Sequence, residues 1–167
     1  MGRSRGGLTT KIHTISEGRG RNLASRITPG QAGDSPQLIP LLDAVNVPRL
    51  EPSVRGRKRL DHLCGDKAYG SRANRRALRG RRIPHAIPEQ DNVKKARTRR
   101  GSRGGRPPKF DPERYKTRNQ VERLMNRRKQ FRAVATRFDK LADRYRATVR
   151  IADIFIWLRA KPDNRLN

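Results

Sequence analysis

Positive charge is the sequence feature that most constrains this chain. Its 167 residues include 42 Lys and Arg but only 15 Asp and Glu, which gives a formal net charge of +27. A chain with this charge repels itself unless a polyanion neutralises it, and nucleic acid is the usual polyanion in cells. Arg outnumbers Lys, and its planar guanidinium binds phosphate or guanine through two hydrogen bonds at once. We therefore expect a nucleic-acid partner.

The rest of the composition allows one modest folded domain. Hydrophobic residues make up 32% of the chain and aromatic residues 5%, with 14 Gly and 11 Pro. We expect this domain to cover residues 1–159, with a C-terminal tail over residues 160–167. Between Lys94 and Lys109 the chain carries eight cations and no acid, so we expect a basic flexible loop over residues 92–110.

Two sequence features argue against a membrane or a secreted disulfide fold. The most apolar run, residues 151–158, is too short to span a bilayer and contains Asp153. Cys64 has no second cysteine to pair with, and the pair His62 and Cys64 is not followed by another pair at zinc-ligand spacing. We expect a cytoplasmic protein with a buried thiol beside a loop imidazole.

Turn signals and hydrophobic periodicity predict an α/β fold. The expected order is β-β-α-β-α-β-α-α. Its elements are a hairpin over residues 8–15 and 23–28, a helix after Asp34-Ser35-Pro36, a short strand over residues 60–65, a helix capped by Ser71 and stopped by Gly80, a short strand within residues 83–88, a helix over residues 112–131 and a helix over residues 140–159.

The helix expected over residues 112–131 holds one carboxylate among cations. Tyr115, Arg118, Glu122, Met125 and Lys129 follow one another at steps of three and four, so they share one stripe of that helix. Glu122 either forms an ion pair with Arg118, worth roughly a few tenths of a kcal/mol, or takes part in chemistry. Spacing alone favours the ion pair.

Asp66 is a second isolated acid in a basic stretch. It follows a short apolar strand and precedes a Gly/Ser turn and a helix. It either shapes that turn or acts as a metal-binding acid, since carboxylates often lie at the carboxyl end of a strand. Taken with Glu122, it suggests two-metal phosphoryl transfer, in which carboxylates hold Mg²⁺ among phosphate-binding cations.

Several segments resemble the DDE transposases of bacterial insertion sequences. They include "GRSRGGLTTKIH", "TPGQAGDSPQ", "DKAYGSRANR", "RRGSRGGRPPKFDPERYKTRNQVERLMNRRKQFRAVATRFDKLA" and "IADIFIWLR". Within them, the family signature Y-x₂-R-x₃-E-x₆-K is complete, with Tyr115, Arg118, Glu122 and Lys129. The signature is highly specific when every spacing holds.

The resemblance implies an RNase H-like fold, a mixed sheet flanked by helices, in which three acids bind two Mg²⁺ ions. Asp66 matches the second acid and Glu122 the third, so both are expected to be catalytic and metal-binding. Tyr115, Arg118 and Lys129 are expected near the backbone of the transposon end. The implied partners are transposon-end and target DNA and possible further copies of the chain, in the bacterial cytoplasm near the nucleoid.

The chain departs from this family at its start. The family's first catalytic Asp lies on a strand before the segment "GRSRGG", and no acid precedes Glu17 here. We therefore expect a truncated catalytic domain that lacks the first strand and the first Asp, which an upstream polypeptide could supply. Ser25 and Arg26 also stand where the family usually has aliphatic residues.

The basic loop supports two interpretations of DNA contact. The segment "GGRPPK" contains the Gly-Arg-Pro core of an AT-hook, but a loop that binds phosphates without sequence preference is the favoured interpretation. We expect Arg99, Arg100, Arg103 and Arg106 to bind DNA. The alternative function for the whole chain is a non-catalytic basic protein that binds nucleic acid.

Overall fold

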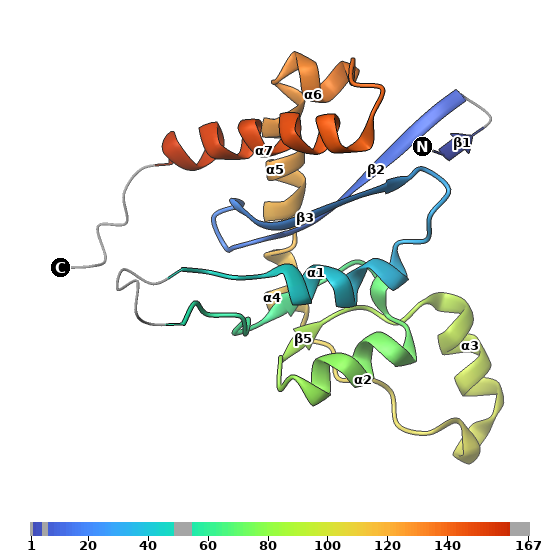
Figure 1. The fold of residues 1–167 in the computed structure, drawn as a ribbon. Coiled ribbons are helices and arrows are strands. Elements are labelled where there is room, and N and C mark those ends of the chain that lie inside the picture. The colour runs from blue at the N-terminus through green and yellow to red at the C-terminus, as the bar shows by residue number, and fades with distance from the viewer. Residues whose placement is uncertain (1, 5–6, 49–54, 161–167) are drawn as a thin grey trace. The chain divides into compact units, whose positions relative to one another are not determined.

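The computed structural model describes residues 2–4, 7–48 and 55–160, and these form two compact units (Figure 1). Unit 1 combines the described parts of residues 1–32 and 120–167, while unit 2 is the described part of residues 33–119. The fold is mixed α/β, as the sequence predicts. Most of the expected tail over residues 160–167 lies outside the described residues.

Unit 1 contains an antiparallel sheet of three strands in the order β1-β2-β3. The strands are β1 (Gly2–Ser4), β2 (Gly7–Ser16) and β3 (Asn22–Pro29), with Ile12 opposite Ile27. The turn between β2 and β3 places Gly20 at φ +72°, a conformation that favours glycine. The predicted hairpin is therefore confirmed.

Three helices complete unit 1: α5 (Asn119–Lys129), of which all but Asn119 belongs to this unit, α6 (Arg132–Thr136) and α7 (Ala142–Leu158). Helix α7 lies across the hairpin of β2 and β3 (Figure 1). The core contains side chains of α6, α7 and both strands: Val134, Tyr145, Val149 and Ala152, packed against Ile12, Ile27 and Phe131. The expected helix over residues 140–159 is confirmed, and α6 is an element that the sequence analysis missed.

Several apolar side chains of α7 face solvent. Ile151, Ile154 and Leu158 have exposed fractions of 55%, 56% and 75%. The buried stripe is narrow because it follows the steps of three and four from Tyr145 through Val149 to Ile156, and the three exposed residues lie beside that stripe.

A buried ion pair ties α5 to α7 and to the hairpin. Arg128 donates two hydrogen bonds to the carboxylate of Asp153, from Nε and Nη2, each 2.7 Å long. The same guanidinium donates to Ser25 Oγ, and Asn22 Nδ2 donates to Asp153 Oδ2 at 2.8 Å. Side-chain exposure is 1% for Arg128 and 6% for Asp153, so the pair is dry and its hydrogen bonds are satisfied within the protein.

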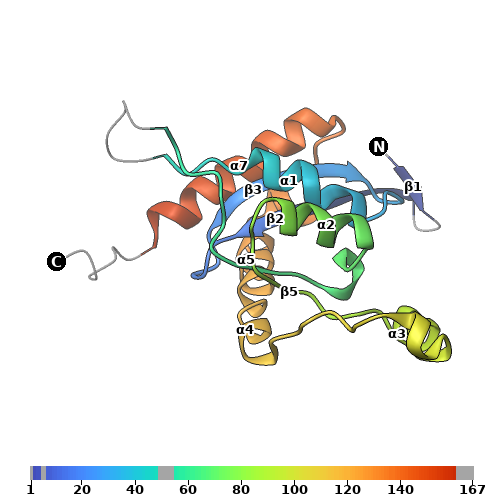
Figure 2. The same ribbon diagram turned by 90° about the horizontal axis from the view of Figure 1, so that it is seen from below.

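Unit 2 combines a two-stranded parallel sheet with short helices. Strand β4 (Leu63–Cys64) pairs with β5 (His85–Ala86), with Leu63 opposite His85. The helical elements are η1 (Ser35–Gln37), α1 (Leu38–Ala44), η2 (Lys67–Tyr69), α2 (Arg72–Gly80), α3 (Asp91–Arg99), η3 (Gly101–Gly104) and α4 (Pro112–Lys116). Helices α1 and α2 lie side by side (Figure 2).

Helix α2 is anchored by polar as well as apolar side chains. Ser71 caps it by accepting a hydrogen bond from the Asn74 amide, as predicted, and Leu78 is fully buried. Arg75 donates to the carbonyl oxygens of Gly70, Ile87 and Pro88. Gly80 is the last helical residue, and the left-handed conformation after the helix falls on Arg82. These contacts fix which side of α2 faces solvent.

The expected basic flexible loop over residues 92–110 contains two helical elements, α3 and η3. Asp91 in the first turn and basic residues in the last turn of α3 both complement the helix dipole, and no Gly or Pro interrupts the chain before Gly101. Within the described residues α3 buries no side chain. The segment predicted as a loop thus contains helical structure, and its flexibility stays a prediction.

The helix expected over residues 112–131 is interrupted at Thr117 and Arg118, between α4 and α5. There the amides of Thr117 and Arg118 bond to the carbonyls three residues earlier, which is tighter than an α-helix. The Thr117 hydroxyl also donates to the Arg114 carbonyl at 2.7 Å, a bond that competes with helical pairing. The five residues of the predicted stripe therefore do not share one continuous helix.

The described helices contain none that is long and apolar enough to cross a membrane.

Candidate functional site

Asp66 follows β4 after one intervening residue, Gly65, and caps η2. Its backbone is extended, and its Oδ1 accepts a hydrogen bond of 2.6 Å from the Lys67 amide. This bond confirms the turn-shaping role that the sequence left open. The side chain is nevertheless exposed to solvent. A cation can therefore still reach the carboxylate.

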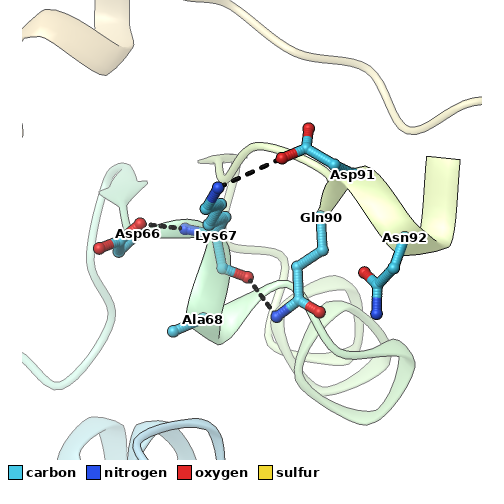
Figure 3. A pocket seen from close by; sticks show the side chains of 6 residues that line it. All are labelled: Asp66, Lys67, Ala68, Gln90, Asp91 and Asn92. Carbon is cyan, nitrogen blue, oxygen red and sulfur yellow. Dashed lines mark hydrogen bonds and ion pairs between the residues drawn. The ribbon is translucent and has the colours of Figure 1, made fainter.

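Asp66 lines an open hollow of unit 2, which we call the acid hollow (Figure 3). Its lining comes from η2 and the start of α3: Asp66, Lys67, Ala68, Gln90, Asp91 and Asn92. Lys67 Nζ lies 3.3 Å from Asp91 Oδ2, and Gln90 Nε2 donates to the Lys67 carbonyl. These contacts join η2 to the start of α3.

The donor chemistry of the acid hollow fits a hard cation. Two carboxylates and two side-chain amides line it, and it has no His or Cys among its lining residues. Oxygen donors of this kind are the ligands that Mg²⁺ prefers. Across the described parts of the chain, no three His, Cys, Asp or Glu side chains gather into a metal-binding group. Asp66 is thus a candidate metal ligand without a complete set of ligands around it.

Glu122 lies in the first turn of α5, in unit 1, whereas Asp66 belongs to unit 2. Glu122 and Lys129 are both exposed, and Lys129 is the last residue of the same helix. Leu124 is fully buried and fixes which side of α5 faces the core. The structure therefore places the two predicted acids on exposed surfaces of different units.

Tyr115 and Arg118 form a small cluster of their own in unit 2. The Arg118 guanidinium lies 5.6 Å from the centre of the Tyr115 ring, and that ring lies 5.3 Å from the ring of Phe110. A guanidinium held over an aromatic face keeps its charge and can still bind phosphate. The break between α4 and α5 divides the family signature. Tyr115 and Arg118 belong to the part before α5, whereas Glu122 and Lys129 belong to α5 itself.

The four arginines predicted to bind DNA are all exposed, at the end of α3, in η3 and just beyond it: Arg99, Arg100, Arg103 and Arg106. Helix α3 is held by the pair of Arg97 and Glu89, whose side chains form two hydrogen bonds of 2.9 and 3.2 Å. The hydrogen bond from Arg97 lowers the pKa of Glu89, and the same bond raises the pKa of Arg97. Both side chains thus stay charged, and the positive charge of Arg97 compensates the negative charge of Glu89.

The sequence analysis missed Arg72 and a second hollow of unit 2. This basic hollow is lined by side chains from the start of α2 and from α3, among them Arg72, Asn92, Arg97 and Arg100. The available signal was the spacing of Arg72, Arg76 and Arg79 after the Ser71 cap, which places three cations along one side of a helix.

Comparisons with known proteins identify the family of this chain. The family model described as "Transposase DDE domain" matches residues 2–152. The chain belongs to the DDE transposase family. This DDE transposase chain is 30% identical over 152 residues to a protein of Brucella ovis named as a transposase for insertion sequence element IS6501, covering 91% of the chain and 100% of the relative.

A second DDE relative is longer. A protein of Burkholderia cepacia, named as a transposase for insertion sequence element IS402, is 32% identical over 147 residues, which cover 85% of this chain and 59% of that protein. The chain thus spans about three fifths of the length of this relative. No solved structure matches the chain.

Proposed function

We propose that this chain is part of the catalytic domain of an insertion-sequence transposase, in which Asp66 and Glu122 bind Mg²⁺ while DNA is cleaved and joined. The observation that carries this proposal is the complete spacing of Tyr115, Arg118, Glu122 and Lys129 in a chain of the DDE family. The exposure of both carboxylates supports it, since a buried acid could not reach a DNA-bound cation. The RNase H-like arrangement of the sheet belongs to this proposal.

In this proposal the carboxylates bind the metal and the cationic side chains bind phosphate. Bound Mg²⁺ would activate the attacking oxygen and neutralise charge on the phosphate. Arg118 and Lys129 hold backbone phosphates of the transposon end, while Tyr115 positions the Arg118 guanidinium. The exposed arginines of α3 and η3 bind DNA through its phosphates, without reading sequence.

A complete site needs a further carboxylate. The resemblance to the family implies three acids, and the chain offers Asp66 and Glu122. We propose that another polypeptide, such as an upstream product, supplies the third. Assembly of several copies on transposon-end and target DNA in the bacterial cytoplasm belongs to the same proposal.

Plasmid transposition in bacterial cells tests the roles of the two acids. The DNA that flanks the coding sequence serves as the candidate transposon ends, and the upstream coding frame is included. We expect Asp66→Asn and Glu122→Gln each to lower transposition at least about 100-fold, since metal ligands act in the transition state. Binding to DNA should persist, because neither carboxylate contacts phosphate directly.

Two exposed acids serve as matched controls. Asp61 and Glu113 have side-chain exposures of 79% and 78% and lie outside the proposed site. Asp61→Asn and Glu113→Gln should leave transposition unchanged. Normal transposition by Glu122→Gln would refute the assigned role.

A second candidate is a non-catalytic protein that binds nucleic acid. The exposed cations of α3 and η3 favour it, since they require only a polyanion. It predicts DNA binding that weakens steeply with salt and is the same with and without Mg²⁺. Transposition that depends on Asp66 and Glu122 would exclude it.

A further inference from the structure

The arginines of unit 2 divide into two groups by their contacts. One group holds the fold: Arg75 bonds to backbone carbonyls, Arg97 pairs with Glu89 and Arg81 pairs with Asp43. The other group is exposed, and within the described residues its side chains have no hydrogen bond or acidic partner. Its members include Arg72, Arg76, Arg79 and Arg100. Nothing in the fold of unit 2 accounts for this second group.

Three members of the second group form a row along α2. Arg72, Arg76 and Arg79 are separated by four and three residues, which places them on one side of the helix. At a rise of about 1.5 Å per residue the row is about 10 Å long. The buried residues Asn74, Arg75 and Leu78 hold other positions of α2 against the protein, so the helix cannot rotate the row away from solvent.

The first arginine of this row also lines the basic hollow, which has a volume of about 490 Å³. Arg72 comes to the hollow from α2 and Arg100 from the residue after α3, so two cations on different elements face one space. The acid in its lining, Glu89, is already paired with Arg97. The hollow therefore offers uncompensated positive charge at a concave surface, the condition under which a phosphate binds well.

The basic hollow adjoins the acid hollow. Asn92 lines both, while Gln90 and Asp91 belong to the acid hollow and Val93 to the basic one. The start of α3 thus separates Asp66 from Arg72 and Arg100 (Figure 3 shows the acid side).

We propose that the basic hollow binds a backbone phosphate of nucleic acid through Arg72 and Arg100, and that Arg76 and Arg79 bind the following phosphates of the same strand. These phosphate sites form a track, which runs along α2 to the basic hollow and ends at the acid hollow. Only its orientation toward Asp66 rests on the proposed function. Phosphate binding itself rests on the charges and their placement.

Salt-dependent binding to a duplex tests the proposal. The probe is a fluorescein-labelled duplex of roughly 30 base pairs and arbitrary sequence, and anisotropy gives the affinity across a salt series. Each lost phosphate contact reduces the slope of log affinity against log salt by about 1. We expect Arg72→Gln with Arg100→Gln to reduce the slope by about 2, and Arg76→Gln with Arg79→Gln to reduce it similarly.

The control removes the same charge elsewhere. Arg144 and Arg150 are exposed on α7 in unit 1, and Arg144→Gln with Arg150→Gln should leave the slope nearly unchanged. The double variant Arg72→Lys with Arg100→Lys keeps both charges, so its slope should equal that of the unmodified chain. Thermal unfolding followed by circular dichroism confirms that every variant is folded.

The outcomes separate this proposal from the proposed function. Equal slope changes in the α2 and α7 variants would overturn the track, since net charge alone would explain them. An unchanged slope in the Arg72 and Arg100 variant, or no restoration by lysine, would also overturn it. If the unmodified chain fails to bind the duplex, the DNA-binding part of the proposed function fails as well.

Discussion

Arg128 and Asp153 show how a very basic chain places charge inside a core. The guanidinium is buried, yet its hydrogen bonds reach Asp153, Ser25 and the thioether of Met125. Asn22 donates a further hydrogen bond to the Asp153 carboxylate, and the Trp157 indole donates to the Asn22 carbonyl. The network joins α5, α7 and β3 through directional bonds, so it fixes how these elements are aligned more tightly than apolar contact would.

Breaking this pair should strongly destabilise unit 1. Asp153→Ala leaves the Arg128 guanidinium buried without its counter-ion, at a cost of about 3–5 kcal/mol in the free energy of unfolding. Urea unfolding at neutral pH, followed by tryptophan fluorescence, measures the loss.

The double variant Arg128→Met with Asp153→Leu is the informative comparison. Replacing both charges by apolar side chains of similar size is often neutral or stabilising, so the double variant should be more stable than Asp153→Ala. A double variant as unstable as the single one would show that Ser25 and Asn22, rather than the ion pair, dominate the network.

At the scale of elements, α3 depends on a surface contact rather than on a core. Glu89 precedes the helix and Arg97 lies near its end, so their pair holds α3 against the segment that follows β5. Because the Arg97 hydrogen bond lowers the pKa of Glu89 from its ordinary value of 4.5, folding favours the ionised carboxylate. The resulting stability is present above pH 4.5 and is lost as the pH falls through the lowered pKa.

Glu89→Gln should therefore reduce stability at pH 7 but not in acid. We expect a loss of about 0.5–1 kcal/mol at pH 7, since the pair is partly exposed to solvent. The two proteins should become equally stable once the pH has fallen below the lowered pKa of Glu89, where both carry an uncharged side chain. Urea unfolding at several pH values checks this, and a constant difference across that range would contradict it.

Local signals in the sequence were sufficient to predict the elements that are bounded by turn or capping residues. The hairpin around Gly20, the Ser71 cap of α2 and the position of Asp66 after β4 were all predicted from residue types within a few positions. The break between α4 and α5 was missed because it depends on the Thr117 hydroxyl, which bonds to the Arg114 carbonyl and lies 3.2 Å from Cys64 Sγ. A partner more than 50 residues away leaves no local pattern.

The sequence suggested candidate site residues, whose role stays a prediction, but it did not predict their surroundings. The spacing of Tyr115, Arg118, Glu122 and Lys129 identified a family signature, and the exposure of Glu122 agrees with a residue available to ligands. The two hollows were not predictable, because they arise where η2, α2 and α3 meet. Only the fold brings Arg72 and Arg100 to one concave surface.

For the whole molecule, charge repulsion limits stability. With a net charge of +27, the folded chain brings cations closer together than the unfolded chain does. Raising NaCl from about 30 mM to about 300 mM shortens the screening length and should raise the melting temperature. For a chain of this size, each 1 kcal/mol gained raises it by roughly 2–4 °C.

Thermal unfolding by circular dichroism measures this effect, with sucrose at matched osmolality as the uncharged control. Under the proposed function, duplex DNA at low salt should raise the melting temperature further, as expected of a ligand that binds the folded protein more tightly than the unfolded one. A melting temperature that falls with NaCl would show that attractive ion pairs outweigh the repulsion.

The division of the chain into units also sets the order in which it can fold during synthesis. Unit 2 is continuous over residues 33–119, whereas unit 1 joins residues 1–32 to residues 120–167. On the ribosome, the β2–β3 hairpin emerges early, but its partner α7 is translated more than a hundred residues later. Until then the apolar side chains of the hairpin, such as Ile12 and Ile27, are not packed against α7. Nascent chains should therefore depend on chaperones or on bound nucleic acid until the last helix is made.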